Sequence, residues 1–192
     1  MKKNVINTIA AAGLICTLAG NDQSTKEGSV KANVLLYQSA SGDADEGTSV
    51  FSMTGGSMTS ESGAMFYCTN TNSEIYLSDA ELVLSEDETL LIVSEGRWGK
   101  EGKNGGNCSL YAESQELDGD ILVDDISSLS LELTDSSFEG AIQGEGVVYV
   151  TLNQGSSWVL TGDSYITAID GDLSGLDLNG YELYIDGTPY EG

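Results

Sequence analysis

The apolar positions of this chain repeat over five segments. In each segment an apolar residue is followed by a second one two positions later and by a third about seven positions after the first. The five sets are Phe51/Met53/Met58, Ile75/Leu77/Leu82, Leu110/Ala112/Leu117, Leu131/Leu133/Phe138 and, with one additional residue, Val150/Leu152/Trp158. Side chains alternate between the two faces of a strand, so the first two members of a set share one face. Each set therefore predicts a short strand, a turn and a second strand.

The spacing of the sets indicates how these strands are arranged. Their first members lie 24, 35, 21 and 19 residues apart, and the longest interval contains a glycine-rich insert at residues 96–107. A period near 20 residues is too short for helical repeats or propeller blades, but it fits one rung of a β-solenoid. Because the rungs are unequal, we predict an all-β fold, a right-handed parallel β-helix (β-solenoid) of about six to seven short coils.

Turn residues separate the strands at corresponding places. Gly55, Asp79 and Asp135 follow the first two apolar members of their sets, and Gly and Asp suit tight corners. After Trp158 the pattern is weaker, and the last strands end at Pro189, which we expect to close the final edge because proline cannot donate to another strand.

The N-terminus differs in composition from the rest of the chain. Lys2 and Lys3 precede an uncharged, mostly apolar run from Val5 to Leu18, followed by Ala19 and Gly20. This pattern predicts a secretory signal peptide over residues 1–20, although a buried or frayed N-terminal helix is the alternative. We assign residues 21–33 to a polar linker and residues 34–192 to a single β-helix domain. The expected location is extracellular or at the cell surface.

The balance of acidic and basic residues limits the classes of partner that the chain can bind. The chain has 7 basic and 31 acidic residues and a net charge of −24, which becomes −26 if residues 1–20 are removed with their two lysines. Nucleic acids and anionic membranes require a basic surface, so the sequence argues against both as partners, and no second segment is apolar enough for membrane insertion. Solubility is the favoured explanation for the acidity.

Two cysteines remain outside the N-terminal segment. Cys68 and Cys108 would form one disulfide in an oxidising compartment. They occupy different phases of the repeat, however, and both adjoin apolar strand residues, where a free cysteine behaves as a small buried hydrophobic residue. The interpretation as buried free cysteines is therefore favoured, and the disulfide stays open.

Several Gly/Ser/Thr turns between strands carry a resemblance to a known group of proteins. The stretches are Met53–Met58, Met65–Thr71, Arg97–Gly99 with Asn104–Gly106, Leu117–Ile121 and Gly155–Thr161. In this order they resemble the secreted β-helix repeat proteins of gut Gram-positive bacteria, often described as adhesin-like or carbohydrate-binding. The resemblance covers about residues 34–187. It implies a pectate-lyase-like fold and a cell-surface setting, but no catalytic residues.

Some enzymes that act on pectin have this fold, so a catalytic role was considered. The pair Asp124-Asp125 is the candidate for carboxylate chemistry, yet neighbouring residues on a strand point to opposite faces. The chain also has no histidine, and three of its seven basic residues, Arg97, Lys100 and Lys103, lie together in the insert. We therefore predict no catalytic residues and regard a degenerate polysaccharide-acting enzyme as an alternative only.

The glycine-rich insert is the candidate recognition site. It concentrates cations and an aromatic ring on one loop, and loops on a rigid scaffold commonly carry function. Its candidate ligand-binding residues are Arg97, Trp98, Lys100, Lys103 and Asn104. Trp98 would stack on a sugar ring, whereas in the structural alternative it folds back over the solenoid edge.

Three clusters of acidic residues are candidates for calcium binding. They are Asp43/Asp45/Glu46, Asp118/Asp120/Asp124/Asp125 and Asp170/Asp172/Asp177. None has a recognised calcium-loop spacing, so ordinary turn aspartates are the favoured interpretation, and we predict no metal and no cofactor.

Together these observations predict a non-catalytic binding or adhesion module at the cell surface. Its expected ligand is a saccharide or a host surface protein. A structural spacer within a surface protein is the remaining alternative.

Overall fold

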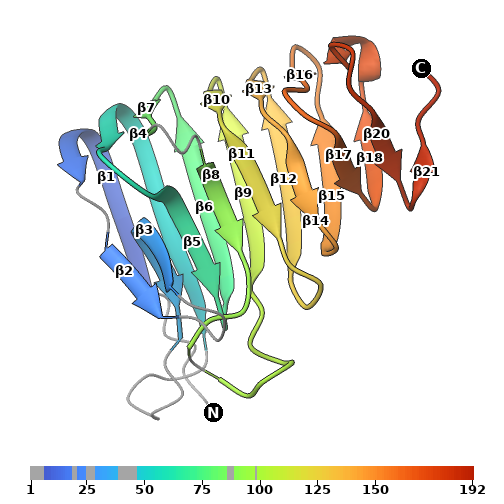
Figure 1. Ribbon diagram of the computed structural model, residues 1–192. Coiled ribbons are helices and arrows are strands. Elements are labelled where there is room, and N and C mark those ends of the chain that lie inside the picture. The colour runs from blue at the N-terminus through green and yellow to red at the C-terminus, as the bar shows by residue number, and fades with distance from the viewer. Residues whose placement is uncertain (1–6, 19–20, 25–28, 39–46, 86–88, 98) are drawn as a thin grey trace, which may run out of the picture.

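The chain winds into a β-solenoid. The computed structural model describes residues 7–18, 21–24, 29–38, 47–85, 89–97 and 99–192. Over these residues the chain forms about six turns whose parallel strands stack along one axis (Figure 1). The predicted all-β solenoid is therefore confirmed.

From Asn107 onward, a full turn contains three strands, each in a different sheet. Sheet 1 consists, in order, of β1 (Asn7–Leu18), β4 (Thr48–Ser60), β6 (Asn72–Ser78), β9 (Asn107–Glu113), β12 (Ser128–Thr134), β15 (Val147–Leu152) and β18 (Ala168–Gly171), with β7 (Glu81–Val83) also paired to β4. Sheet 2 consists of β14 (Ile142–Gly144), β11 (Asp120–Val123), β8 (Thr89–Val93), β5 (Ala64–Thr69), β3 (Ser29–Tyr37) and β2 (Asn21–Ser24).

Two smaller sheets complete the walls. Sheet 3 consists of β10 (Glu116–Asp118), β13 (Ser137–Glu139), β16 (Ser157–Val159) and β19 (Leu176–Asp177). Sheet 4 consists of β17 (Ser164–Ile166), β20 (Leu183–Ile185) and β21 (Thr188–Pro189), and a single 3-10 turn spans Leu173–Gly175. One turn of the solenoid thus runs from β12 through β13 to β14, and the next from β15 through β16 to β17.

The repeated apolar sets form registered columns inside the solenoid. Strand pairing aligns the first members of the five sets: Phe51, Ile75, Leu110, Leu131 and Val150. The second members form another column: Met53, Leu77, Ala112, Leu133 and Leu152. All ten are buried, and the third members Leu117, Phe138 and Trp158 align on sheet 3. The spacing in the sequence therefore predicts which residues stack on one another.

On four successive strands of sheet 1, β4, β6, β9 and β12, the corner uses a left-handed backbone conformation. Gly55, Asp79, Ser114 and Asp135 have φ values of 64°, 51°, 50° and 49°, and each directly follows a residue of sheet 1 at the same register. Gly, Asp and Asn adopt this conformation most readily. The predicted role of Gly55, Asp79 and Asp135 as corner residues is confirmed.

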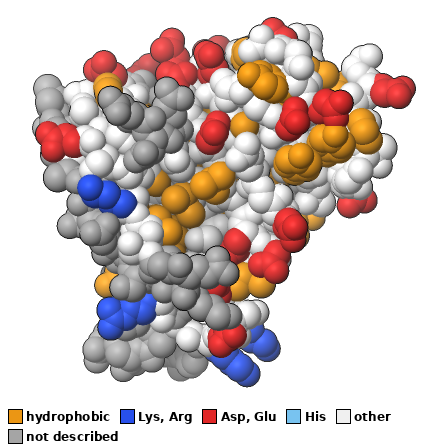
Figure 2. Space-filling model, viewed as in Figure 1, with side chains coloured by type: hydrophobic (Ala, Val, Ile, Leu, Met, Phe, Trp, Pro, Cys, Tyr) orange, Lys and Arg blue, Asp and Glu red, His pale blue; other side chains and the backbone are white. Residues whose placement is uncertain are grey.

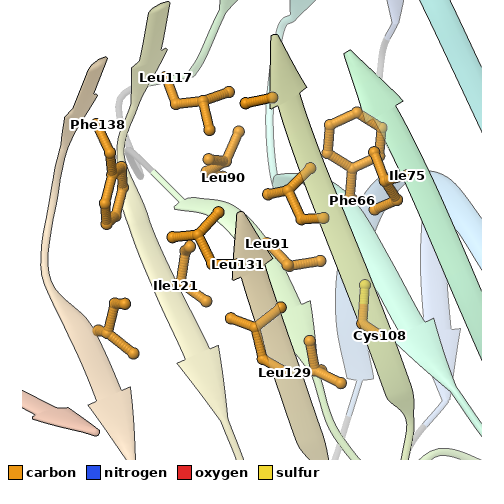
Figure 3. Close-up of a cluster of buried hydrophobic side chains, with 14 of the residues drawn as sticks. Phe66, Ile75, Leu90, Leu91, Cys108, Leu117, Ile121, Leu129, Leu131 and Phe138 are labelled. Carbon is orange, nitrogen blue, oxygen red and sulfur yellow. The ribbon is translucent and has the colours of Figure 1, made fainter. Parts of the chain in front are cut away.

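A third wall of the core comes from sheet 2. Its inward residues Phe66, Leu91, Ile121 and Ile142 are aligned by strand pairing and fully buried. Figure 3 shows Phe66 beside Ile75 of sheet 1, and Leu91 and Ile121 beside Leu131 of the same sheet. The apolar sides of three sheets therefore enclose one continuous interior.

The N-terminal segment takes part in the solenoid. Asn7–Leu18, within the predicted signal peptide, forms β1 and pairs in parallel with β4 from Asn7 opposite Ser49 to Leu18 opposite Ser60. Residues 21–33, assigned above to a linker, contain β2 and the start of β3, which pair antiparallel. Ala19 and Gly20 lie outside the described residues. Removal of the first 20 residues on export stays a prediction.

The C-terminal end closes with an antiparallel strand. Thr188 and Pro189 form β21 beside β20, and the Tyr190 backbone N–H donates to the Leu183 carbonyl over 2.7 Å. The last parallel strand of sheet 4 is thereby covered on one side, as expected from the position of Pro189.

Candidate functional site

The glycine-rich insert is a loop that joins sheet 2 to sheet 1. It leaves β8 at Val93, enters β9 at Asn107 and projects below the strands, in yellow-green, in Figure 1. Three hydrogen bonds hold its first residues. The Tyr67 hydroxyl donates to the Glu95 carbonyl over 2.7 Å, the Glu95 backbone N–H donates to Asp124 Oδ2 over 2.6 Å, and Asn104 Nδ2 donates to the Gly96 carbonyl over 2.8 Å. The base of the loop is therefore fixed to the scaffold.

The predicted recognition residues divide into two groups. Arg97, Lys100 and Lys103 are exposed, and Figure 2 shows basic side chains mainly toward the lower end of the molecule, where the loop projects. Asn104 is only 4% exposed, and its amide nitrogen is used inside the loop. Trp98 lies outside the described residues. The structure thus places the three cations at the surface and gives Asn104 a role in holding the loop.

Asn104→Ala is expected to loosen the loop without unfolding the solenoid. It removes the hydrogen bond to the Gly96 carbonyl, and a neutral hydrogen bond contributes about 1 kcal/mol, so the open loop becomes about fivefold more populated. Trypsin cleaves after Arg97, Lys100 and Lys103, so limited proteolysis followed by mass spectrometry measures this opening. Cleavage is expected to accelerate about fivefold.

Asn107→Ala is the matched control for this measurement. Asn107 ends the same loop, but the hydrogen bonds of its side chain within the described residues go to the side chains of Asn72 and Ser128 on neighbouring strands. Equal cleavage rates in both variants would contradict the role given to Asn104.

A second candidate surface lies on the outer face of sheet 1, where strands begin. A groove of about 370 Å³ there is lined by residues of five successive strands, β4, β6, β9, β12 and β15. We call it the sheet 1 groove, and its lining residues are Thr48, Asn72, Ser73, Glu74, Asn107, Cys108, Ser109, Ser128, Leu129, Ser130 and Tyr149. The groove starts where the glycine-rich loop ends, since Asn107 and Cys108 are the first residues of β9.

Hydroxyl and amide groups dominate the groove. Asn107 Nδ2 donates to Asn72 Oδ1 over 3.2 Å, and the Ser128 hydroxyl donates to Asn107 Oδ1 over 2.8 Å. Strand pairing sets these three residues side by side. The neighbouring outward positions Ser109 and Ser130 are small, so they leave room above the sheet. Such a surface both donates and accepts hydrogen bonds.

Tyrosine rings flank the groove. The Tyr149 side chain is 51% exposed and lines it directly. In the next outward column, the Tyr76 and Tyr111 rings stack with centroids 4.8 Å apart and an interplanar angle of 10°. The Tyr76 hydroxyl donates to Glu74 Oε2 over 2.9 Å. Partial burial and this carboxylate raise the pKa of Tyr76 to about 12, so Tyr76 is a neutral phenol at physiological pH.

Charge is scarce in the groove. Glu74 is the one carboxylate among its lining residues, in a chain with 31 acidic residues. Figure 2, which shows one face of the molecule, has acidic side chains spread over much of the surface. The sheet 1 groove is therefore a nearly neutral patch on a strongly acidic protein.

Sequence reasoning missed this groove, although a signal for it exists. The residue three positions before the first member of each apolar set is Thr48, Asn72, Asn107, Ser128 and Val147, and four of these five line the groove. A polar residue at a fixed offset from a core position faces outward at the same place on successive rungs.

A second hollow lies near the corner between sheets 3 and 2. It measures about 450 Å³ and is lined by Leu82, Val83, Leu84, Ser85, Asp118, Gly119, Asp120, Glu139 and Thr161. Asp120 Oδ1 already accepts hydrogen bonds from the Ala141 backbone N–H and the Thr161 hydroxyl. Among the described residues, no group of three or more His, Cys, Asp or Glu side chains is arranged to hold a metal ion.

Four other aspartates of the predicted acidic clusters accept hydrogen bonds from backbone N–H groups. Asp124 binds Glu95 N–H, and Asp170, Asp172 and Asp177 accept from the N–H groups of residues 171, 174 and 179. The bonds from Ser174 lower the pKa of Asp172. These are the contacts of turn and loop aspartates. The cluster Asp43/Asp45/Glu46 lies outside the described residues.

Comparisons of this chain with protein-family models, curated proteins and solved structures gave no match. Over the described residues, no helix has the length and apolar character of a membrane span.

Proposed function

We propose that this chain is a secreted or cell-surface, non-catalytic binding module that recognises a neutral saccharide through the sheet 1 groove. The observation that carries the proposal is the composition of that groove: hydroxyl and amide groups in register on successive strands, an exposed tyrosine ring beside them and a single carboxylate.

The chemistry of the groove matches that of a sugar. A sugar presents hydroxyl groups that donate and accept hydrogen bonds, and Asn72, Asn107 and Ser128 offer both kinds of partner. A sugar ring also has apolar C–H faces, which pack against an aromatic ring such as that of Tyr149. The volume of about 370 Å³ lies in the range of small-molecule sites.

Electrostatics favours a neutral over an acidic saccharide. The chain has a net charge of −24, and the half-buried Glu74 in the groove would repel a carboxylate or sulfate group. The proposal of a non-catalytic role is supported by the same residue. Hydrolysis of a glycosidic bond ordinarily uses two carboxylates that flank the bond, and the groove lining contains one.

The rigid scaffold also supports binding. The lining residues belong mostly to β6, β9, β12 and β15, which are fixed by parallel pairing over their full length. A preformed surface loses little conformational entropy when a ligand binds. The exposed loop cations Arg97, Lys100 and Lys103 are assigned to the periphery of this site rather than to its centre.

Tyr149→Ala is expected to weaken saccharide binding at least about tenfold, because it removes the apolar platform beside the groove. The full chain is first applied to a glycan array, and the best neutral glycan is then titrated against both variants by calorimetry. Tyr181→Ala is the matched control, since Tyr181 is 42% exposed and lies outside the groove lining. It is expected to bind as the unmodified chain does.

Three results would count against the proposal. The first is a chain that retains no glycan, and the second is an equal loss in Tyr149→Ala and Tyr181→Ala. The third is a loss caused by Trp98→Ala but not by Tyr149→Ala, which would move the site to the glycine-rich loop. Release of reducing ends from the bound glycan would overturn the non-catalytic role.

A further inference from the structure

Two cysteine thiols meet inside the solenoid. Cys68 lies on β5 of sheet 2 and Cys108 on β9 of sheet 1, 40 positions apart in the sequence. Their sulfur atoms are 3.5 Å apart, and the side chains are 0% and 4% exposed. Figure 3 shows the Cys108 sulfur pointing into the core. Different phases in the repeat therefore do not keep these residues apart, because the two sheets face each other across the interior.

The pair lies under both candidate surfaces. The Ser94 backbone N–H, at the start of the glycine-rich loop, donates to the Cys68 carbonyl over 3.1 Å. Gly106, at the end of the loop, packs against the same carbonyl so closely that a Cβ there would lie 2.6 Å from its oxygen. Cys108 itself lines the sheet 1 groove. A bond between the two cysteines would thus join β5, which contacts both ends of the loop, to β9, which lines the groove.

We propose that Cys68 and Cys108 are a modification site at which an internal disulfide forms, with a small-molecule disulfide such as oxidised glutathione as the oxidant. The Cys108 thiolate attacks one glutathione sulfur and releases a first glutathione thiolate. The Cys68 thiolate then attacks the Cys108 sulfur of this mixed disulfide and releases the second. The two cysteines lose two electrons and two protons, and oxidised glutathione gains them as two reduced glutathione molecules.

The geometry requires little rearrangement. A disulfide has an S–S distance of about 2.05 Å, so the sulfur atoms must approach from their present 3.5 Å. Both residues lie on strands fixed by pairing on each side, β5 between β3 and β8 and β9 between β6 and β12. The bond would clamp sheet 2 to sheet 1. That this clamp steadies a ligand groove rests on the proposed function, whereas formation of the disulfide does not.

Burial determines when the bond forms. The hydrogen bond between the thiols and the burial of Cys108 raise its pKa well above the usual value, so the folded protein holds very little Cys108 thiolate. A bulky oxidant also cannot reach Cys68, which is fully buried. Oxidation therefore proceeds while the chain folds, before the rungs close over the pair. Folded reduced protein is expected to oxidise at least about tenfold more slowly.

The test refolds the full chain carrying Cys16→Ser, so that only the two core cysteines remain. Refolding takes place either in a mixture of oxidised and reduced glutathione or in reductant alone, followed by alkylation and trypsin digestion. Trypsin leaves Cys68 in peptide 32–97 and Cys108 in peptide 104–192. The oxidised sample is expected to contain these peptides joined, lighter by two hydrogen atoms than their sum. It is also expected to melt roughly 10 °C higher than the reduced sample.

Cys68→Ser and Cys108→Ser are the controls, and neither should show a melting difference between the two refolding conditions. Should a serine variant not fold, the peptide analysis of the Cys16→Ser chain decides alone. Separate alkylated peptides after oxidative refolding would overturn the proposal, whereas a joined form that melts no higher would contradict the clamping of sheet 2 to sheet 1. Loss of glycan binding with the disulfide intact would count against the proposed function but not against this site.

Discussion

Trp158→Ala is expected to lower the melting temperature by about 6–20 °C, because it removes the largest side chain in the core. Trp158 is 0% exposed, and its ring stacks on Phe138 with centroids 5.7 Å apart. Its indole N–H donates to the Gly140 carbonyl over 3.0 Å. The substitution leaves a cavity between two rungs and a buried carbonyl without its donor, and such changes destabilise by about 3–5 kcal/mol. Thermal unfolding followed by circular dichroism measures the shift.

Tyr181→Ala supplies the comparison for this experiment. Tyr181 is 42% exposed, so its truncation is expected to shift the melting temperature by no more than about 2 °C. A Trp158→Ala variant that melts within 2 °C of the unmodified chain would show that the third apolar column is not packed as described.

Gly144→Ala is expected to destabilise the protein by at least about 3 kcal/mol. Gly144 ends β14 with φ at +116°, a conformation that side chains rarely adopt. A Cβ at this position would lie 1.9 Å from the Val123 carbonyl oxygen of the neighbouring strand. Both backbones are held in place by strand pairing, so the contact cannot be relieved by moving a side chain. Chemical denaturation gives the free energy of unfolding.

Gly180→Ala is the matched variant. Gly180 also has a positive φ, +86°, but a Cβ there meets no atom within 4 Å. It therefore isolates the backbone strain, about 1–2 kcal/mol, from the steric contact. If both variants lost the same stability, the close approach of Gly144 to Val123 would be refuted.

The sequence predicts sheet 1 and sheet 3 well but leaves sheet 2 undetected. Phe51, Ile75 and Leu110 are each followed by an apolar residue two positions later and by another seven positions later. This spacing is constant because the corner that follows them has the same length in each rung. The distance to sheet 2 varies. Ile121 follows Leu117 by four residues, whereas Phe66 follows Met58 by eight, because the intervening corner is longer in the early rungs. A pattern search with a fixed spacing cannot align such positions.

The apolar repeat in the sequence also does not predict which side chains meet across the interior. Cys68 and Cys108 touch because sheet 2 faces sheet 1, and that arrangement depends on corner geometry rather than on periodicity. Asn104 is a similar case. Its polarity predicts a surface contact, yet its amide is buried where it can satisfy the Gly96 carbonyl.

The groove has a length that depends on the number of rungs. Thr48, Asn72, Asn107 and Ser128 occupy one register position on four neighbouring strands, and parallel strands lie about 4.8 Å apart. At the fifth strand the position holds Val147, which interrupts the polar row. Duplication of a rung that carries a polar residue here would lengthen the groove by one strand spacing. In this architecture the length of the molecule that the groove accommodates changes by one strand spacing for each rung that is inserted or deleted.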